Sequence, residues 1–158
     1  MEHRMQINPI GHIHAAGGNF YIQLSKDYRA GLTNIEGFSH LQVVWWGSLF
    51  DQPEHRRQLV NGQVYKHSPE HQGVFATRSQ FRPNPILITN IFVESIDREQ
   101  GIIRTPYLDA EDGTPVLDIK PYHRYERVRD CRVPTWCDHW PQWHEEAATF
   151  NWEAEFNF

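Results

Sequence analysis

Cysteine is almost absent from this chain, which has only Cys131 and Cys137 among its 158 residues. Two cysteines are too few for the disulfide framework of a small secreted domain. Apolar runs are short, and none approaches the roughly 20 residues that a membrane-spanning helix needs. The N-terminal sequence MEHRMQINPIGHIH also lacks the apolar stretch of a signal peptide. These absences predict a soluble cytoplasmic protein with no membrane partner, and the length suits a single domain over residues 1–158.

Positive charge is also scarce, because the net charge is −5 with the histidines neutral. That balance argues against a broad nucleic-acid-binding surface, which needs an excess of lysine and arginine. A local exception is the stretch KPYHRYERVRDCR, residues 120–132, in which five cations face only Glu126 and Asp130. The five cations are Lys120, Arg124, Arg127, Arg129 and Arg132. Two interpretations stay open: a solvated, ion-paired stretch, or a contact with RNA phosphates made by Lys120, Arg124 and Arg127.

Three common catalytic and nucleotide-binding motifs are missing. The stretch HAAGGNF has adjacent glycines without the G-x-G-x-x-G spacing of a dinucleotide-binding turn. No phosphate-binding loop with Gly-Lys-Ser/Thr is present, and no G-x-S-x-G nucleophile turn. The sequence therefore does not favour a Rossmann fold, a nucleoside triphosphatase or an ordinary serine hydrolase.

Metal ligands of the usual spacing are missing as well. Cys131, Cys137, His139 and His144 form the pattern C-x5-C-x-H-x4-H, whereas paired zinc ligands usually lie two to four residues apart. Prolines and tryptophans interrupt this pattern, which indicates a packed aromatic segment. We therefore expect no metal site. The aspartates at 109, 112 and 118 surround a Gly-Thr-Pro turn, where such residues usually bond to local backbone amides.

What the sequence does contain is a series of short strand patterns. Strands are expected at residues 20–25, 38–48, 73–79, 86–96 and 102–109, the second apolar on both faces and hence central. A turn or short helix is expected at residues 26–37, and a helical turn after Pro53. The spacing is too short for repeated helical crossovers. The sequence therefore predicts a mainly β, non-Rossmann fold, a barrel or rolled antiparallel sheet with short helical segments.

The end of the chain alternates strictly between aromatic and polar residues. In TFNWEAEFNF, residues 149–158, one face would carry Phe150, Trp152, Phe156 and Phe158. A free segment of this kind would expose a large apolar patch, which soluble monomers avoid. We therefore expect residues 149–158 to dock as a strand on the barrel or on a partner subunit.

The stretch GVFATRSQFRPNPI, residues 73–86, has the character of a ligand-binding loop. Arg78 and Arg82 carry planar guanidinium groups that suit carboxylate or phosphate. Prolines at 83 and 85 fix the backbone, which lowers the entropy lost when a ligand binds. Asn84 between them offers hydrogen-bond donors and an acceptor. A strand-end loop whose arginines pair with surface acids is the other interpretation.

The same stretch, together with DGTPVLDIKPY at residues 112–122, closely resembles the signature of the TsaA-like family, also called YaeB-like or TrmO-like. IEGFSHLQVVWW, residues 35–46, resembles a third block of that family, and the blocks occur in the family's order. The resemblance covers about residues 7–125 and leaves a Trp-rich C-terminal extension, residues 126–158, in place of the C-terminal domain of longer bacterial members. The sequence departs from the family pattern at HAAGGNF, where a loop is shortened, and at Ser48, where the family has histidine.

The resemblance implies a compact β-barrel that binds S-adenosyl-L-methionine and acts as a homodimer with the cofactor near the subunit interface. It implies methyl transfer to tRNA, on N6 of threonylcarbamoyladenosine at position 37, or else cofactor binding without transfer, or methyl transfer to another substrate. The cofactor-binding positions carried over are Arg78, Ser48, Leu49, Ile88, Asp112, Gly113, Thr114 and Pro115. Candidates for the chemistry are Arg82 and Asn84, which could hold the modified adenosine, and Asp118, which could accept a proton.

Overall fold

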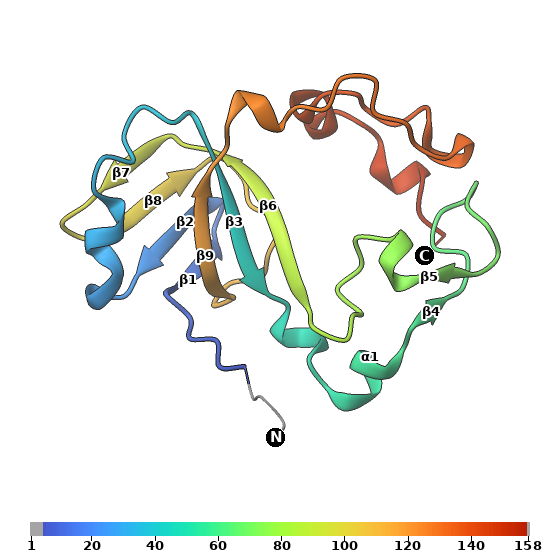
Figure 1. The fold of residues 1–158 in the computed structure, drawn as a ribbon, viewed down its shortest axis with the longest axis horizontal. Helices are drawn as coiled ribbons and strands as arrows, with labels where there is room; N and C mark the ends of the chain where they lie inside the picture. Colours follow the sequence, from blue (N-terminus) through green and yellow to red (C-terminus); the bar gives the residue numbers. More distant parts are fainter. Residues whose placement is uncertain (1–4, 158) are drawn as a thin grey trace.

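The structure is a computed structural model that describes residues 5–157, and its main feature is a seven-stranded antiparallel sheet (Figure 1). The strand order is β6-β3-β9-β1-β2-β8-β7. The strands are β1 (Gly11–Ala16), β2 (Asn19–Leu24), β3 (His40–Trp46), β6 (Ile86–Phe92), β7 (Ser95–Asp97), β8 (Ile102–Thr105) and β9 (Pro115–Pro121). A separate ribbon pairs β4 (Val60–Asn61) with β5 (Gln72–Gly73).

The helices are all short. The α-helix α1 covers Pro53–Arg57. The 3-10 helices are Lys26–Leu32, Ser48–Phe50, Val74–Ala76, Arg124–Glu126, Thr135–Cys137, His144–Ala148 and Trp152–Ala154. The prediction of a mainly β fold with short helical segments is confirmed, and the antiparallel pairing excludes a Rossmann sheet. None of the helices within residues 5–157 has the length and apolar character that a membrane crossing requires.

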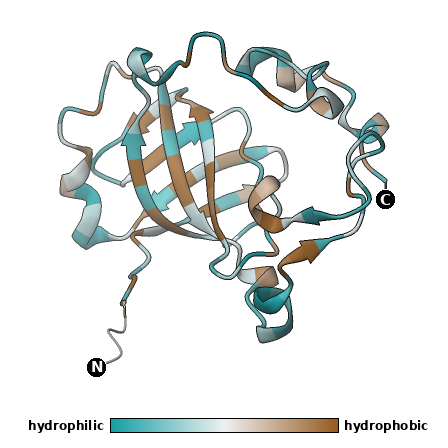
Figure 2. Ribbon diagram, turned by 45° about the vertical axis from the view of Figure 1, so that its right-hand side comes forward, coloured by the Kyte–Doolittle hydropathy of each residue, from teal (hydrophilic) through white to brown (hydrophobic). Residues whose placement is uncertain are grey.

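The core lies on one face of the curled sheet (Figure 2). Along β3, Leu41, Val43 and Trp45 are at most 4% exposed, and they alternate with half-buried residues. They pack with buried side chains of the other strands, among them Ile22 and Ile91. Burial of each such side chain contributes about 1.5–3 kcal/mol. β3 has β6 and β9 as neighbours, so the prediction of a central strand is confirmed.

The two outer strands of the sheet, β6 and β7, follow each other in the chain. The single long strand predicted over residues 86–96 is wrong, because the backbone changes its partner at Val93. The Val93 N–H donates to Ser39 O at 2.9 Å, while the Glu94 N–H donates to Arg104 O at 2.9 Å. The residues around Val93 therefore connect β6, which pairs with β3, to β7, which pairs with β8 at the other edge of the sheet. No closed sheet is formed by the described pairings, so the compact barrel stays a prediction.

The strand predicted over residues 73–79 is wrong for most of its length. Only Gly73 belongs to a strand, β5, which pairs with the two residues of β4. The chain then turns into the 3-10 helix Val74–Ala76, and both the backbone N–H and the hydroxyl of Thr77 donate to Val74 O. A local side-chain bond of this kind competes with strand pairing.

The C-terminal extension, described as far as residue 157, arcs from the end of β9 to the ribbon of β4 and β5 (Figure 1). We call the residues between β3 and β6, 47–85, the arm. The end of the extension docks on the arm: Lys66 N–H donates to Glu155 O at 2.8 Å, and Tyr65 forms an isolated bridge with Phe156. The tail therefore docks within the chain, but on the arm, whereas the sequence predicted docking on the barrel or on a partner subunit.

The strand predicted for the tail is wrong. Its centre is the 3-10 helix Trp152–Ala154, and the Asn151 side chain accepts from Ala154 N–H at 3.3 Å. An asparagine before a helical turn accepts a hydrogen bond from a backbone N–H of that turn. In a strand the same N–H would need a partner on a neighbouring strand. Trp152 packs edge-on against Trp140 at 5.3 Å, so a helical turn also buries aromatic surface. Phe158 of the predicted strand lies outside the described residues.

Candidate functional site

The three sequence blocks meet at one end of the strands β3, β6 and β9. β3 ends at Trp46, which pairs with Ile86 at the start of β6. Trp45 pairs with Val116 near the start of β9. Because neighbouring antiparallel strands run in opposite directions, the segment after β3 and the segments before β6 and β9 lie at the same edge. Ser48, the loop before β6 and the Asp112–Thr114 turn are therefore brought together.

The loop before β6 is held by bonds to its own backbone. One nitrogen of Arg82, Nη1, donates to Thr77 O at 2.9 Å and to Ser79 O at 3.0 Å. Pro85 is fully buried, and its carbonyl accepts from Gly47 N–H at 2.8 Å. A Cβ at Gly47 would lie 3.0 Å from Leu87 Cδ1, so a side chain there would have to displace Leu87 where the loop and the strand approach each other. The sequence prediction of a rigid loop agrees with this geometry. One of the three guanidinium nitrogens of Arg82, Nη1, is used to hold the loop itself.

Arg56, on α1, is a residue of this site that the sequence reasoning missed. Its Nε donates to Pro83 O at 2.7 Å, its Nη2 to Asn84 Oδ1 at 3.0 Å, and its Nη1 to Asp51 Oδ1 at 3.1 Å. Asp51 in turn accepts from Trp46 Nε1 at 3.0 Å. The one signal in the sequence is an arginine in a helical turn just after the Trp-rich strand. Because Asn84 Oδ1 is engaged, the amide presents its N–H donors to a ligand.

Arg78 lies exposed beside β6, with one nitrogen, Nη2, donating to Ile88 O at 2.9 Å. Its charge also reaches Tyr65 on the arm. Burial raises the pKa of Tyr65, and the Arg78 guanidinium opposes that rise. Tyr65 packs against Trp136 and Trp140, with ring centroids 5.5 Å and 4.9 Å away. The docked extension therefore contacts Tyr65, a residue within electrostatic reach of the predicted cofactor arginine.

The outer face of β3, β6 and β9 carries a row of predicted site residues. Ile88 is opposite Val44, and Val44 is opposite Asp118. Ile88 is 47% exposed, and Leu49, just beyond β3, is 59% exposed. A β-bulge between β3 and β9 follows Val44, and bulges re-aim side chains next to functional sites.

Asp118 is already bound in this row. Its Oδ2 accepts from Lys120 Nζ, and its Oδ1 accepts from Ile119 N–H at 2.9 Å. The hydrogen bond from Lys120 raises the pKa of that lysine. Lys120 is thus ion-paired, as one of the two sequence interpretations expected.

The turn at Asp112, Gly113, Thr114 and Pro115 is tied to β1. Asp112 Oδ1 accepts from Ala15 N–H at 3.0 Å, and Gly113 has a φ of +79°, which glycine adopts without strain. The aspartate therefore bonds to a backbone amide that is distant in sequence rather than local. Pro115 begins β9, so the turn fixes where that strand enters the sheet.

The other cations of residues 120–132 differ from Lys120. The arginines at 124, 127, 129 and 132 are all exposed. Within residues 5–157 none of their guanidinium groups forms an ion pair, and the Arg127 Nε donates only to Arg124 O at 3.3 Å. For these four residues the ion-paired interpretation is wrong.

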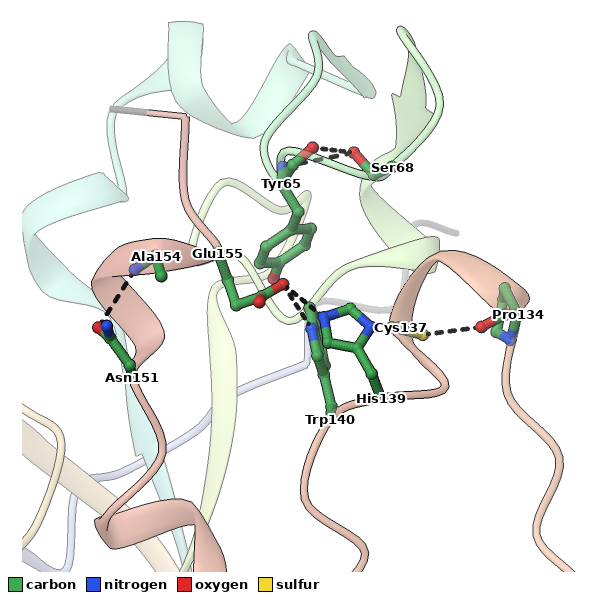
Figure 3. A network of polar contacts seen from close by, with 9 residues as sticks. All are labelled: Tyr65, Ser68, Pro134, Cys137, His139, Trp140, Asn151, Ala154 and Glu155. Atoms are coloured by element: carbon green, nitrogen blue, oxygen red, sulfur yellow. Dashed lines mark hydrogen bonds and ion pairs between the residues drawn. The ribbon is translucent and has the colours of Figure 1, made fainter.

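The Cys and His side chains of the extension bond to different partners, as Figure 3 shows for Cys137 and His139. Cys137 donates to Pro134 O, and burial raises the pKa of its thiol, while Cys131 is exposed. His139 Nε2 lies 3.0 Å from Glu155 Oε2. Among the described residues no group of three or more His, Cys, Asp or Glu side chains could hold a metal ion.

Glu155 is the polar centre of the docked extension (Figure 3). It is only 8% exposed, and its Oε2 accepts from Trp140 Nε1 at 2.9 Å as well as facing His139. These bonds, first from Trp140 and then from His139, hold the pKa of Glu155 below its usual value. A cavity of about 580 Å³ lies alongside, lined by residues of the extension such as Trp140 and Phe150. It includes none of the predicted cofactor-binding residues.

Comparison with known proteins finds a family model and several proteins that are similar to this chain. The family model of the tRNA-methyltransferase O N-terminal domain matches residues 3–126. A probable S-adenosyl-L-methionine-binding protein of Archaeoglobus fulgidus is 42% identical over 101 residues, 64% of this chain and 25% of that protein. A probable S-adenosyl-L-methionine-binding protein of Pyrococcus horikoshii is 38% identical over 125 residues, 77% of this chain and 85% of that protein.

The tRNA (adenine(37)-N6)-methyltransferase of Escherichia coli is 32% identical over 121 residues, 71% of this chain and 48% of that protein. A crystal structure of TrmO from Pseudomonas aeruginosa has a TM-score of 0.64 and 25% identity, covering 85% of this chain and 62% of that one. A second TrmO crystal structure has a TM-score of 0.61 and 27% identity, covering 82% of this chain and 63% of that one. The match thus spans less than two thirds of several of these relatives.

Proposed function

Because the chain belongs to the family of tRNA-methyltransferase O N-terminal domains, we propose that it is an S-adenosyl-L-methionine-dependent methyltransferase that acts on tRNA. The observation that carries the proposal is the meeting of the three sequence blocks at one end of β3, β6 and β9. The proposed target is N6 of threonylcarbamoyladenosine at position 37: the name of the Escherichia coli relative supports N6 of adenine 37, and the threonylcarbamoyl group follows from the family resemblance alone.

The residues at this end of the sheet fit the proposed cofactor. Leu49 and Ile88 offer exposed apolar surface, and Arg78 keeps nitrogens that have no partner among residues 5–157. A guanidinium suits a carboxylate such as that of a methionine group. Ser48 and the turn from Asp112 to Pro115 border the same end. When bound, the cofactor supplies a methyl group activated on a sulfonium.

The substrate is proposed to lie against the loop before β6. Asn84 presents amide donors because Arg56 holds its oxygen, so it suits an acceptor atom of the nucleoside. Arg82 keeps Nε and Nη2 free of partners within the described chain, and a threonyl carboxylate would suit them. Transfer to N6 releases one proton, for which Asp118 is the candidate acceptor once Lys120 moves aside.

The proposed partners follow from the same surfaces. A homodimer would cover the apolar outer face of β6, where Ile86, Ile88 and Phe92 are 38%, 47% and 47% exposed. Large exposed apolar patches mark interaction sites. Lys120, Arg124 and Arg127 are proposed RNA contacts, and cytoplasmic tRNA is the proposed substrate pool.

A second candidate function is cofactor binding without methyl transfer. It is favoured by the relatives from Archaeoglobus and Pyrococcus, whose names state probable S-adenosyl-L-methionine binding and nothing more. The two functions share the cofactor site and differ in the chemistry on RNA.

Calorimetry with S-adenosyl-L-methionine and mass spectrometry of tRNA nucleosides together test both. We expect saturable cofactor binding, and we expect a methylated adenosine to disappear from the tRNA of a deletion strain. Cofactor binding with an unchanged nucleoside profile would support the second function. Absence of cofactor binding would reject both.

A further inference from the structure

A column of aromatic rings rises from the core to the surface just after β9. Phe38, which packs against the core, meets His123 edge-on with ring centroids 5.3 Å apart. His123 is in turn stacked on Tyr125, with centroids 5.2 Å apart and planes inclined by 18°. Tyr125 is 82% exposed, so it ends the column with a ring face open to solvent.

The backbone under this ring is fixed. Tyr125 lies in the middle of the 3-10 helix Arg124–Glu126. The Glu126 N–H donates to His123 O at 3.0 Å, and the Glu126 side chain accepts from His123 N–H at 3.0 Å. A ring that is already ordered loses little entropy when a second ring stacks on it.

The charge around Tyr125 is positive. Arg124 and Arg127 flank it, and Arg129 and Arg132 follow within the same exposed segment. None of these four guanidinium groups is ion-paired within the described chain, whose overall net charge is −5. A local cluster of free arginines on an acidic protein is complementary to phosphate.

We propose that Tyr125 is a stacking platform for an unpaired nucleobase of RNA, and that Arg124 and Arg127 hold the adjoining phosphates. Proteins that bind single-stranded RNA combine open aromatic faces with a cationic track in this way. Tyrosine and arginine also occur in protein interfaces. RNA fits better here, because four arginines in nine residues, none ion-paired within residues 5–157, match the closely spaced charges of a phosphate backbone. The proposal deepens the proposed function and rests on it, since it takes RNA to be the partner.

The position of Tyr125 indicates which base it would hold. β9 begins beside the cofactor-binding turn and ends at Pro121, so its length of roughly 20 Å separates that turn from the start of the Tyr125 segment. The stacked base is therefore not the methylated adenosine but another unpaired nucleotide of the same RNA. Loss of the ring should raise KM for tRNA and leave kcat unchanged.

The test compares Tyr125→Ala, Tyr125→Phe and Arg124→Ala in the full-length protein, with an anticodon stem–loop RNA and a fully paired RNA duplex as probes. We expect Tyr125→Ala to weaken binding of the stem–loop by roughly 5- to 150-fold, the range for loss of one stacked base. Its salt dependence should match that of the wild type, and Tyr125→Phe should bind like the wild type. Arg124→Ala should lower the salt slope by about 0.7–0.9.

The possible failures can be told apart. Wild-type RNA binding that Tyr125→Ala leaves unchanged would overturn this proposal alone. Equal losses on the stem–loop and on the duplex would also overturn it, because stacking needs an unpaired base. If the wild type binds S-adenosyl-L-methionine but neither RNA, this proposal and the proposed substrate fall together. A Tyr125→Ala variant that changes only the sedimentation behaviour would assign the ring to a protein contact and overturn the RNA proposal.

Discussion

Arg56 is a residue whose guanidinium reaches three separate groups around the loop before β6: Pro83 O, Asn84 Oδ1 and Asp51 Oδ1. Its side chain is 38% exposed, so each bond is partly screened by water. The planar shape of the guanidinium therefore matters more for these bonds than its charge. A lysine side chain has one nitrogen, whereas Arg56 donates from three.

Arg56→Lys is therefore expected to destabilise the fold by about 1–3 kcal/mol, the range for loss of hydrogen bonds from a charged donor. It should also weaken substrate binding, since Asn84 loses the bond that orients its amide. Denaturant unfolding and steady-state kinetics measure the two effects. Arg57→Lys is the matched control, because Arg57 is exposed on the same helix and its side chain has no bond within the described residues. Identical results for the two variants would remove Arg56 from the site.

Arg78→Ala is expected to weaken S-adenosyl-L-methionine binding by about 1.5–3 kcal/mol, the range for a hydrogen bond to a charged group. Among the described residues only Ile88 O accepts from Arg78, through one of its nitrogens, so the rest of the fork is available to the cofactor. Titration calorimetry measures the affinity, with Arg57→Ala as control. Unchanged affinity in a protein whose circular dichroism is that of the wild type would contradict the assignment.

At the scale of elements, local signals predicted some parts well and others badly. The apolar residues on both faces of the β3 segment predicted a central strand, which agrees with its place between β6 and β9, because buried strands need apolar residues whatever their partners are. The alternation of residues 149–158 predicted a strand and failed, because the Asn151 side chain caps a helical turn. The strand prediction for residues 73–79 failed for a similar reason, because the Thr77 hydroxyl donates to Val74 O within a local turn. Sequence patterns indicate which residues are buried. Strand pairing depends in addition on a partner strand that is adjacent in space but distant in the sequence.

The candidate site shows the same limit. The loop at residues 73–86 could be predicted to be rigid and cationic from its own residues. Its meeting with Ser48 and the Asp112 turn came from family resemblance, and the pairing of Trp46 with Ile86 gives the physical reason. Arg56 could not be predicted, because its bonds to Pro83 and Asn84 span 27 and 28 residues.

The stability of the docked end of the extension is expected to depend on pH through Glu155. Its pKa is held below the usual 4.5 by hydrogen bonds from Trp140 and His139 in the folded protein. A lowered folded-state pKa contributes stability that is present above the unfolded value and is lost as the pH falls through the folded value. Glu155→Gln should thus lower the melting temperature at neutral pH and have a smaller effect under acid conditions, below about pH 4.

Glu153→Gln is the control for that comparison, because Glu153 is exposed on the 3-10 helix Trp152–Ala154, which ends just before Glu155. Melting temperatures of the two variants and the wild type across an acid-to-neutral series give the result. A constant difference between Glu155→Gln and the wild type at every pH would show that Glu155 acts through packing rather than through its charge.

At the scale of the whole molecule, the arm and the extension form an arch beside the sheet (Figure 1). Two links close the arch at Tyr65: its bridge to Phe156 and its ring contacts with Trp136 and Trp140. The same tyrosine lies within electrostatic reach of Arg78. The extension is therefore connected with the proposed cofactor site, although residues after 126 lie outside the family match.

Truncation after Thr149 tests this connection, because it removes the bridge at Phe156, the backbone bond from Lys66 to Glu155, and the ring of Trp152. The loss of one buried aromatic side chain alone is worth about 1.5–3 kcal/mol, so the melting temperature should fall and the exposed rings at 65, 136 and 140 should promote aggregation. Because the charge of Arg78 reaches Tyr65, we also expect weaker binding of S-adenosyl-L-methionine. Phe156→Ala separates the two effects, since it removes one ring and keeps the backbone bond at Glu155. If the truncated protein melts, sediments and binds the cofactor like the full chain, the arch has no part in stability or in the site.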